Sequence, residues 1–183
     1  MCGIFGFFKK NLYTQINEDI FSDFTTLLKL TSQRGADKSG FCFFGKNENH
    51  VHKEDNYVDT YINSKSFRCS INKILNNIET HGFFGQTRLL IIGDKQIPEN
   101  NFPIETKYLL GLHNGNFIFD QLDFNNLEFS EKSDSRIFFE NLSENFPFKE
   151  DEFENYLLTS VRELKGDFNI VIYLKSRKFF YLA

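Results

Sequence analysis

The chain has 183 residues, enough for one domain with a buried core, and 40% of them are apolar, which excludes a disordered or collagen-like protein. Its net charge of −4 and pI of about 5.6 disfavour a nucleic-acid binder, because such domains usually carry a clear excess of basic residues. No apolar run approaches the roughly 18 residues that a membrane span needs, and Lys9 and Lys10 follow the apolar start of the chain, whereas a signal peptide has its basic residues first. We therefore expect a cytoplasmic protein whose three cysteines stay reduced, since they have no paired spacing.

Hydrophobic periodicity predicts short strands and helices in the first half of the chain. The expected strands span residues 2–9, 41–45, 57–62 and 82–92, and the expected helices span residues 16–32 and 70–79. Residues 34–40 form a loop punctuated by glycine, and the polar segment 47–56 is expected to form a hairpin loop or tip.

The second half of the chain ends in a group of helices and strands. A strand is predicted at 107–113, helices at 133–146 and 150–164, and strands at 167–174 and 178–182. Asn114 and Gly115 indicate a turn, Ser133 or Asp134 is the expected N-cap, and Gly166 is expected to stop the last helix. Because strands and helices come in clusters, we expect an α+β fold with largely antiparallel sheets. The chain stops in or directly after an apolar strand, so we expect it to be a fragment of a longer protein.

Cys2 is the first residue that can carry chemistry. An initiator methionine before a small residue is removed by aminopeptidase, which would leave Cys2 with a free α-amine beside its own thiol. The unperturbed pKa values of these two groups are about 8 and 8.5, so a neutral amine can take the thiol proton directly or through one water. Nucleophile and general base then come from one residue. The alternative is a small buried apolar residue near the terminus.

Six segments form an ordered pattern along the chain. They are MCGIFG at 1–6, RGADKSG at 34–40, GQTRL at 85–89, HNG at 113–115, SD at 133–134 and GDF at 166–168. In this order they resemble glutamine amidotransferases of the N-terminal-cysteine type. One match alone is weak, whereas six ordered matches over nearly the whole chain are specific. The pair RL at 88–89 and the ending FFYLA at 179–183 look most like the glutaminase half of asparagine synthetases.

The resemblance implies a fold and a reaction. The implied fold is the four-layer αββα sandwich of N-terminal-nucleophile hydrolases, with two mostly antiparallel sheets, and residues 1–183 would form one glutaminase domain. The implied reaction is hydrolysis of the side-chain amide of glutamine to glutamate and ammonia, with Cys2 as the attacking thiol. If the chain stops short of the full domain, late strands of one sheet would be missing and one sheet edge would be exposed.

Two charged residues fit the zwitterionic end of glutamine. Its α-carboxylate and α-ammonium need one cation and one anion, which Arg88 can supply as a bidentate fork and Asp134 as an acceptor. The alternative for Arg88 is an ordinary charge on a strand surface, and for Asp134 a plain N-cap. The resemblance adds Ile91, whose backbone carbonyl would meet the amine end of the substrate, and Asn116, at a position that touches the ammonium in the family.

Asn114 and Gly115 have two interpretations. An Asn-Gly dipeptide most commonly forms a simple hairpin turn. In an oxyanion hole, the Asn114 side-chain amide and the Gly115 backbone N–H would point at the oxyanion of a tetrahedral intermediate, and losing one such donor typically costs about 3 kcal/mol. Glycine suits this role because the backbone must come close to the substrate.

The segment at 34–40 resembles a loop that helps to order the active site of the family. Its matching residues are Arg34, Gly35, Asp37 and Gly40, and the alternative is an ordinary turn after a helix. Four residues depart from the family pattern: Gln86 replaces a histidine, Ala36 a proline, Asn116 the glutamate of the asparagine synthetase branch, and Arg136 an acidic residue or threonine. These departures alter the charge balance of the substrate pocket and leave its catalytic centre of Cys2, Asn114 and Gly115 intact.

Three classes of function stay open. The first is a glutaminase that supplies ammonia to an asparagine synthetase-like domain or subunit, or to the amidation of a sugar or another small metabolite. The second is a non-catalytic relative that binds an amino acid or a partner, and the third is an amidase for a different amide. The expected partners are L-glutamine and the ammonia acceptor, with a homo-oligomer left open and neither nucleic acid nor membrane expected. No cofactor or metal is expected in this domain, and ATP and Mg²⁺ are expected only in a downstream synthetase domain.

Overall fold

The computed structural model describes residues 2–8, 19–35, 37–77, 80, 82–89, 94, 96–118, 131–147, 152–176 and 178–183. The chain divides into two compact units. The first contains Met1–Leu90 and Asn101–Pro103, and the second contains Ile91–Asn100 and Ile104–Ala183. The segment Asn101–Pro103 therefore belongs to the first unit, although the chain on either side of it belongs to the second.

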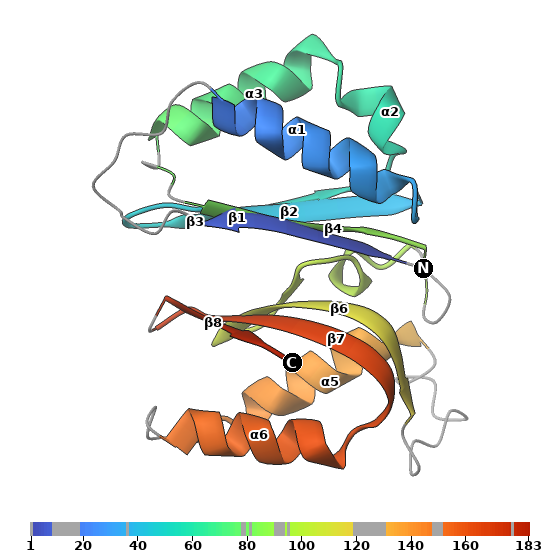
Figure 1. The fold of residues 1–183 in the computed structure, drawn as a ribbon, viewed down its shortest axis with the longest axis vertical. Helices are drawn as coiled ribbons and strands as arrows, with labels where there is room; N and C mark the ends of the chain where they lie inside the picture. Colours follow the sequence, from blue (N-terminus) through green and yellow to red (C-terminus); the bar gives the residue numbers. More distant parts are fainter. Residues whose placement is uncertain are drawn as a thin grey trace. The chain divides into compact units, whose positions relative to one another are not determined.

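The sheet of the first unit has four antiparallel strands in the order β1-β4-β2-β3. They are β1 (Gly3–Phe8), β2 (Lys38–Phe44), β3 (Asn49–Glu54) and β4 (Gly82–Arg88). Gly3 of β1 and Ser39 of β2 both pair with Thr87, so β4 is a central strand. One face of the sheet is covered by the helices α1 (Asp19–Ser32), α2 (Val58–Tyr61) and α3 (Lys65–Asn77), as Figure 1 shows.

The core of the first unit is rich in phenylalanine. Phe24 of α1 is fully buried, and its ring meets the rings of Phe41 and Phe83 edge-on, with centroids 4.7 Å and 5.4 Å away. Strand residues of this core alternate with residues that point to the other face, as the two-residue period of a strand requires. The buried cluster consists of Phe5, Ile20, Phe24, Leu28, Phe41, Phe43, Val58, Tyr61, Ile62, Phe67, Ile71 and Phe83.

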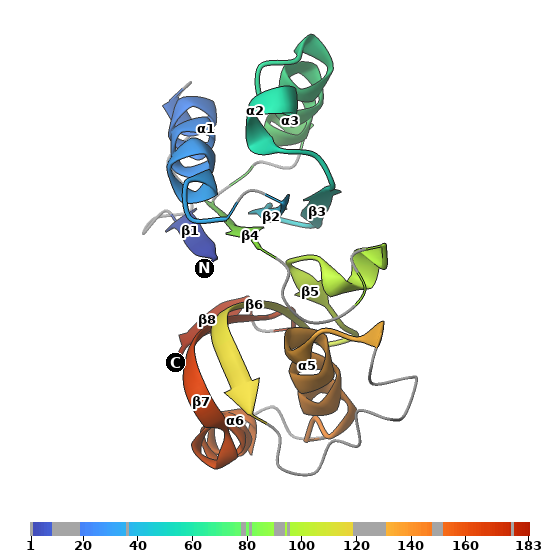
Figure 2. The same cartoon turned by 90° about the vertical axis from the view of Figure 1, so that its right-hand side faces the viewer.

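The second unit also has one sheet and one helical layer. Its sheet is antiparallel in the order β5-β6-β7-β8, with β5 (Ile104–Glu105), β6 (Leu109–Ile118), β7 (Lys165–Leu174) and β8 (Phe179–Leu182). The helices α5 (Asp134–Glu144) and α6 (Phe153–Glu163) lie on one face of this sheet (Figure 2), and the short turn η1 (Pro98–Asn100) precedes β5. Phe139 of α5 is fully buried and packs directly against Gly111 of β6, which fixes the helix on the sheet.

The expected α+β class with two antiparallel sheets is confirmed. The strands β1, β4 and β8 and the helices α5 and α6 lie within a few residues of the predicted segments, and β7 begins two residues before its predicted start. Helix α3 begins at Lys65, five residues before its predicted start at 70. Gly166 lies inside β7 and does not end α6, whose C-cap is Leu164.

Two predictions for the first unit are wrong. Residues 57–62 contain helix α2 in place of a strand, because Val58, Tyr61 and Ile62 are buried together at a spacing that matches one helical face. The polar segment 47–56 contains strand β3 in place of a loop. This strand lies at the sheet edge and pairs with β2, a position where proteins commonly place polar and charged residues.

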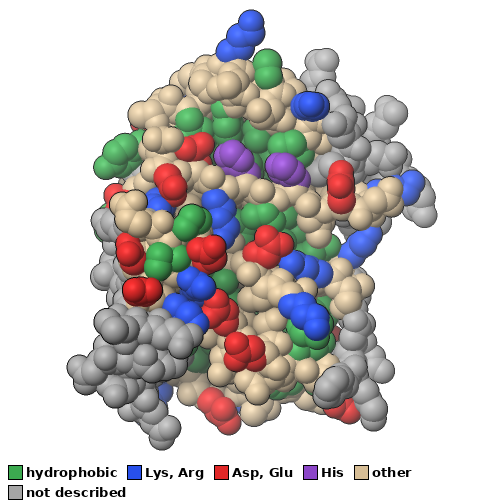
Figure 3. Space-filling view, turned by 180° about the vertical axis from the view of Figure 1, so that it is seen from behind, with side chains coloured by type: hydrophobic (Ala, Val, Ile, Leu, Met, Phe, Trp, Pro, Cys, Tyr) green, Lys and Arg blue, Asp and Glu red, His purple; other side chains and the backbone are tan. Residues whose placement is uncertain are grey.

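Acidic and basic side chains are interspersed over the described residues of the face in Figure 3. That part of the surface therefore shows none of the single-sign basic stripes that bind a nucleic-acid backbone. Among the helices that the structure describes, none is long and apolar enough to cross a membrane.

Candidate active site

Cys2 and Arg88 lie side by side at one end of the first sheet. Gly3 pairs with Thr87, so the residue before Gly3 faces the residue after Thr87 on the antiparallel strand. Gly3 faces α1, since a Cβ added there would lie 2.7 Å from a side-chain carbon of that helix. Because successive side chains of a strand point to opposite faces, Cys2 and Arg88 point away from the helices. Lys38 pairs with Arg88 from β2, which completes a row of three side chains.

This end of the sheet carries two basic side chains, Arg88 and Lys38. Arg88 is 5% exposed, which excludes an ordinary charge on a strand surface. Its guanidinium carbon lies 4.7 Å from the centroid of the Phe102 ring, within the range of a cation–π contact. The Lys38 ammonium lies 2.8 Å from a carboxylate oxygen of Asp55. The Asp55 carboxylate therefore offsets the charge of Lys38 beside Arg88. Cys2 beside it is half-buried and does not form a disulfide.

The loop between α1 and β2 reaches the same end of the sheet. The N–H groups of Arg34 and Gly35 donate to carbonyls in the last turn of α1, at 3.0 Å and 3.3 Å. The Asp37 N–H then donates to the carbonyl oxygen of Arg88 at 3.1 Å. Gly40 was expected in the loop but lies in β2, because the strand begins at residue 38. The loop is therefore bonded to the backbone of the residue that carries the guanidinium.

Gln86 lies on the same face of β4, two residues before Arg88. It is fully buried and pairs with Ile4 of β1 and Gly40 of β2. An amide side chain offers both donors and an acceptor, but unlike the histidine that this position has in the amidotransferases the sequence resembles, it does not titrate. This position therefore contributes hydrogen bonding without charge.

Asn114, Gly115 and Asn116 lie within strand β6. They pair with residues 167–169 of β7, in a ladder of ten pairs. The predicted turn is wrong, because this long ladder outweighs the local preference of an Asn-Gly dipeptide. Gly115 has a φ of +139°, which L residues rarely adopt, and a Cβ there would overlap the carbonyl oxygen of Asp167. Only glycine fits the backbone at this point without strain.

Asp134 is the first residue of α5, and Ser133 is the N-cap, since its hydroxyl accepts the N–H three residues on at 3.2 Å. The alternative role of Asp134 as the N-cap is therefore wrong. Its carboxylate accepts the N–H of Phe117 at 3.3 Å and that of Ser135 at 2.8 Å. The bond to Phe117 places the carboxylate beside the part of β6 that carries Asn116. A helix N-terminus also favours a negative charge.

Sequence reasoning missed two polar residues next to Asp134. The His113 Nδ1 lies 2.8 Å from the Ser135 hydroxyl, which donates to the Asp134 carboxylate at 3.3 Å. Both residues are buried, and the His113 ring stacks on Phe117 with centroids 3.8 Å apart. His113 is the first residue of the HNG segment and Ser135 directly follows the SD segment, so both residues belong to or adjoin motifs that the sequence analysis singled out. The contact itself joins a strand to a helix and could not be deduced from either segment.

Arg136 forms an ion pair within its own helix. Its Nε lies 2.7 Å from a carboxylate oxygen of Glu140, one turn later. Burial alone would raise the pKa of Glu140, but hydrogen bonds from Arg136 and Lys132 outweigh burial and lower that pKa. The positive charge of Arg136 is therefore compensated by a negative charge on α5.

The predicted site residues fall into two groups, one in each unit. The first group contains Cys2, Arg34, Gly35, Asp37, Gly40 and Arg88, and the second contains Asn114, Gly115, Asn116 and Asp134. Ile91 lies outside the described residues. Within the described part of the chain, no three His, Cys, Asp or Glu side chains gather closely enough to hold a metal ion.

Comparisons with known proteins find similar structures but no similar sequences. No protein-family model and no curated protein matches the chain. Glutamine phosphoribosylpyrophosphate amidotransferase from B. subtilis is similar with a TM-score of 0.57 and 18% identity, over 94% of this chain and 34% of that one. A structure described as the allosteric regulatory enzyme of purine biosynthesis is similar with a TM-score of 0.56 and 19% identity, over 93% and 34%. The chain thus spans about a third of the length of these structures, and their likeness confirms the expected N-terminal-nucleophile hydrolase fold.

Proposed function

We propose that this chain is a glutaminase domain, which hydrolyses the side-chain amide of glutamine to glutamate and ammonia. The observation that carries the proposal is the position of Cys2 beside the buried Arg88, in a fold shared with a glutamine amidotransferase. The reaction needs a thiol that attacks the amide and a cation that holds the α-carboxylate of the same molecule within reach.

The nucleophile and the base both belong to Cys2. Removal of Met1 frees the α-amine, which takes the thiol proton, and Sγ adds to the side-chain carbonyl carbon of glutamine. The Asn114 amide and the Gly115 N–H donate to the oxyanion that develops. The Cys2 ammonium returns the proton to the leaving nitrogen, ammonia departs, and a γ-glutamyl thioester remains on Sγ. Water gives a proton to the same amine, adds to the thioester and releases glutamate with the regenerated thiol.

The zwitterionic end of glutamine is held by opposite charges. Arg88 donates to the α-carboxylate and Asp134, oriented by its two N–H bonds, accepts from the α-ammonium. The Ile91 carbonyl and the Asn116 side chain complete the amine end. Asn116 supplies an acceptor oxygen without a second negative charge. The loop residues Arg34, Gly35 and Asp37, together with Gly40 of β2, order the site around Arg88.

The ammonia acceptor that we propose is an asparagine synthetase-like domain or subunit, in the cytoplasm. ATP and Mg²⁺ would act in that part and not in this domain. The RL pair at 88–89 and the ending FFYLA support this branch. Asn116 supports a sugar amidotransferase in its place, because the synthetase branch has a glutamate there. The full enzyme should form asparagine from aspartate, ATP and glutamine, and amidation of a hexose phosphate would contradict this acceptor.

The decisive experiment measures glutamate release from glutamine by three forms of the protein. Cys2→Ala should lose roughly a thousandfold or more of the rate, because no other group forms the thioester. Cys69→Ala, which removes an exposed thiol of α3, should match the unchanged protein. Equal rates for Cys2→Ala and the unchanged protein would disprove the proposed nucleophile.

The mass of the purified protein provides a second control. A chain that retains Met1 should be inactive, since the Cys2 nitrogen is then an amide and cannot accept a proton. The non-catalytic alternative is favoured by the uncharged Gln86 at the histidine position. Glutamine binding by calorimetry without ammonia release, in a protein that has lost Met1, would support that alternative.

A further inference from the structure

The segment Asn101–Pro103 packs on the face of the first sheet that carries Arg88. It lies directly over Gly40 of β2, because a Cβ at Gly40 would overlap the carbonyl oxygen of Phe102 and lie 2.8 Å from its carbonyl carbon. Gly40 pairs with Gln86, and both point away from the helices as Arg88 does. A side chain at residue 40 would therefore displace the segment from the sheet.

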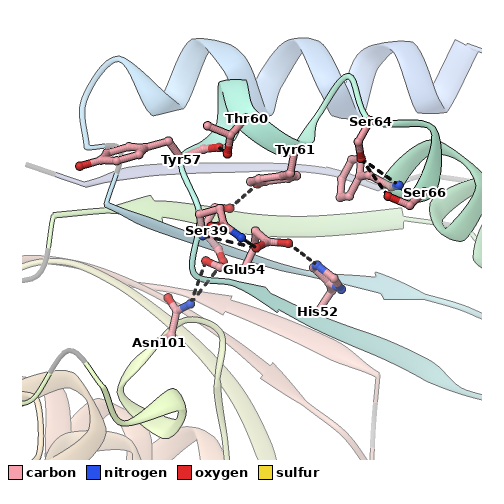
Figure 4. A network of polar contacts seen from close by, with 11 residues as sticks. Ser39, His52, Glu54, Tyr57, Thr60, Tyr61, Ser64, Ser66 and Asn101 are labelled. Atoms are coloured by element: carbon pink, nitrogen blue, oxygen red, sulfur yellow. Dashed lines mark hydrogen bonds and ion pairs between the residues drawn. The ribbon is translucent and has the colours of Figure 1, made fainter.

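Asn101 fastens this segment to two strands (Figure 4). Its Nδ2 donates to the carbonyl oxygens of Ser39 in β2 and Glu54 in β3, at 3.3 Å and 3.5 Å. Its Oδ1 accepts the N–H of Phe102 at 2.9 Å. Asn101 is 1% exposed, so water competes little for these hydrogen bonds. These hydrogen bonds therefore hold the backbone of Phe102 in place independently of its side-chain contacts.

The ring of Phe102 lies against the face of the Arg88 guanidinium. The two side chains belong to residues that are 1% and 5% exposed, and the guanidinium carbon is 4.7 Å from the ring centroid. The five N–H donors of a guanidinium lie in its plane, so an aromatic ring against its face uses none of them. A carboxylate in the place of the ring would neutralise the charge and occupy two donors. An aromatic partner stabilises the cation without neutralising its charge.

We propose that Phe102 is a positioning residue for Arg88 and makes this site selective for ligands that carry an α-carboxylate. This inference rests on the proposed function, in which Arg88 binds the α-carboxylate of glutamine. The ring fixes the plane of the guanidinium and so sets the direction of its N–H edge. A carboxylate in that plane can accept two parallel hydrogen bonds. Without the ring, the guanidinium loses this constraint on its plane, and binding of a carboxylate must restore it.

The test compares two ligands on protein that cannot turn them over. Cys2→Ala is the parent, and calorimetry measures the dissociation constants of glutamine and of glutamine α-amide, which keeps the ammonium but lacks the carboxylate. Phe102→Leu removes the ring, and Phe102→Tyr retains it. The matched control is Phe84→Leu, because Phe84 is 2% exposed, lies on the same strand as Arg88 and contacts Phe44, with ring centroids 5.0 Å apart.

Phe102→Leu should weaken glutamine binding roughly 5- to 30-fold, because binding must then order the guanidinium, a cost that is bounded by the strength of the lost cation–π contact. Binding of glutamine α-amide should change by no more than about twofold, since that ligand makes no use of the guanidinium edge. Phe102→Tyr and Phe84→Leu should both keep the parent ratio of the two dissociation constants. Phe102→Met, which retains most of the side-chain volume, makes the same comparison if thermal unfolding shows that Phe102→Leu does not fold.

Ligand binding by the parent protein distinguishes failure of this inference from failure of the proposed function. If the parent binds glutamine but loss of the Phe102 ring weakens both ligands equally, or weakens glutamine no more than Phe84→Leu does, the ring has only a packing role and the inference is wrong. If the folded parent binds neither ligand, the proposed function fails, and the role of Phe102 fails with it.

Discussion

Replacing Gly115 by alanine should weaken the second unit by forcing a side chain into a strained strand. The φ of +139° lies in a region that costs an L residue about 1–3 kcal/mol. The added methyl group would also overlap the carbonyl oxygen of Asp167 and lie 2.6 Å from the Cα of Phe168, so β6 and β7 would have to separate locally. Loss of about one ladder hydrogen bond adds about 1 kcal/mol. The free energy of unfolding should therefore fall by about 2–4 kcal/mol.

Urea unfolding followed by circular dichroism measures this loss, and a thermal scan should show a midpoint about 4–16 °C lower for a chain of this size. Asn116→Ala is the matched control, because it shortens an exposed side chain on the next residue of the same strand. Its free energy of unfolding should stay within about 0.5 kcal/mol of the unchanged protein. A Gly115→Ala variant as stable as this control would refute the argument from backbone strain.

Three further predictions concern stability. The buried hydroxyls of Ser39 and Tyr61 share a hydrogen bond, so Ser39→Ala and Tyr61→Phe should each lower the free energy of unfolding by about 1 kcal/mol, and the double variant should lose less than their sum in urea titrations. Burial lowers the pKa of His52 below 6.5 despite the opposing effect of Glu54. Because the unfolded chain then binds the proton more readily than the folded chain, the free energy of unfolding should fall as the pH drops below 6.5. His52→Gln should show a smaller difference between urea unfolding at pH 7 and at pH 5, and an unchanged difference would assign this pH dependence to other groups. Ser133→Ala should cost about 1 kcal/mol in thermal unfolding through loss of the α5 N-cap, whereas Ser70→Ala, on an exposed position of α3, should be neutral.

Elements with a long, regular apolar pattern could be predicted from the sequence. Strand β1 and helices α5 and α6 lie near their predicted positions because their apolar residues repeat over several periods. Helix α2 has four residues, too few to show a period, and the shared face of Val58 and Tyr61 becomes visible only in the packed core. In β6, pairing with a strand more than fifty residues later in the chain outweighs the local turn preference around Gly115.

The candidate site was predictable in part for a different reason. The order of short motifs made Cys2, Arg88 and Asp134 candidates, and the physical argument for each is the charge or nucleophile that binding and hydrolysis of glutamine would require. The residues that support them were missed because their roles depend on contacts between distant segments. Phe102 reaches Arg88 only because Gly40 leaves space on a different strand, and no local pattern around Phe102 indicates an aromatic partner for a cation.

The place of Arg88 at the end of a central strand has a consequence for recognition. β4 is hydrogen-bonded to β1 on one side and to β2 on the other. Amides in such a strand exchange with deuterium only through the largest opening motions of a unit. The backbone around Arg88 is thus already ordered in the free protein. Binding of a ligand to Arg88 should therefore cost little main-chain conformational entropy.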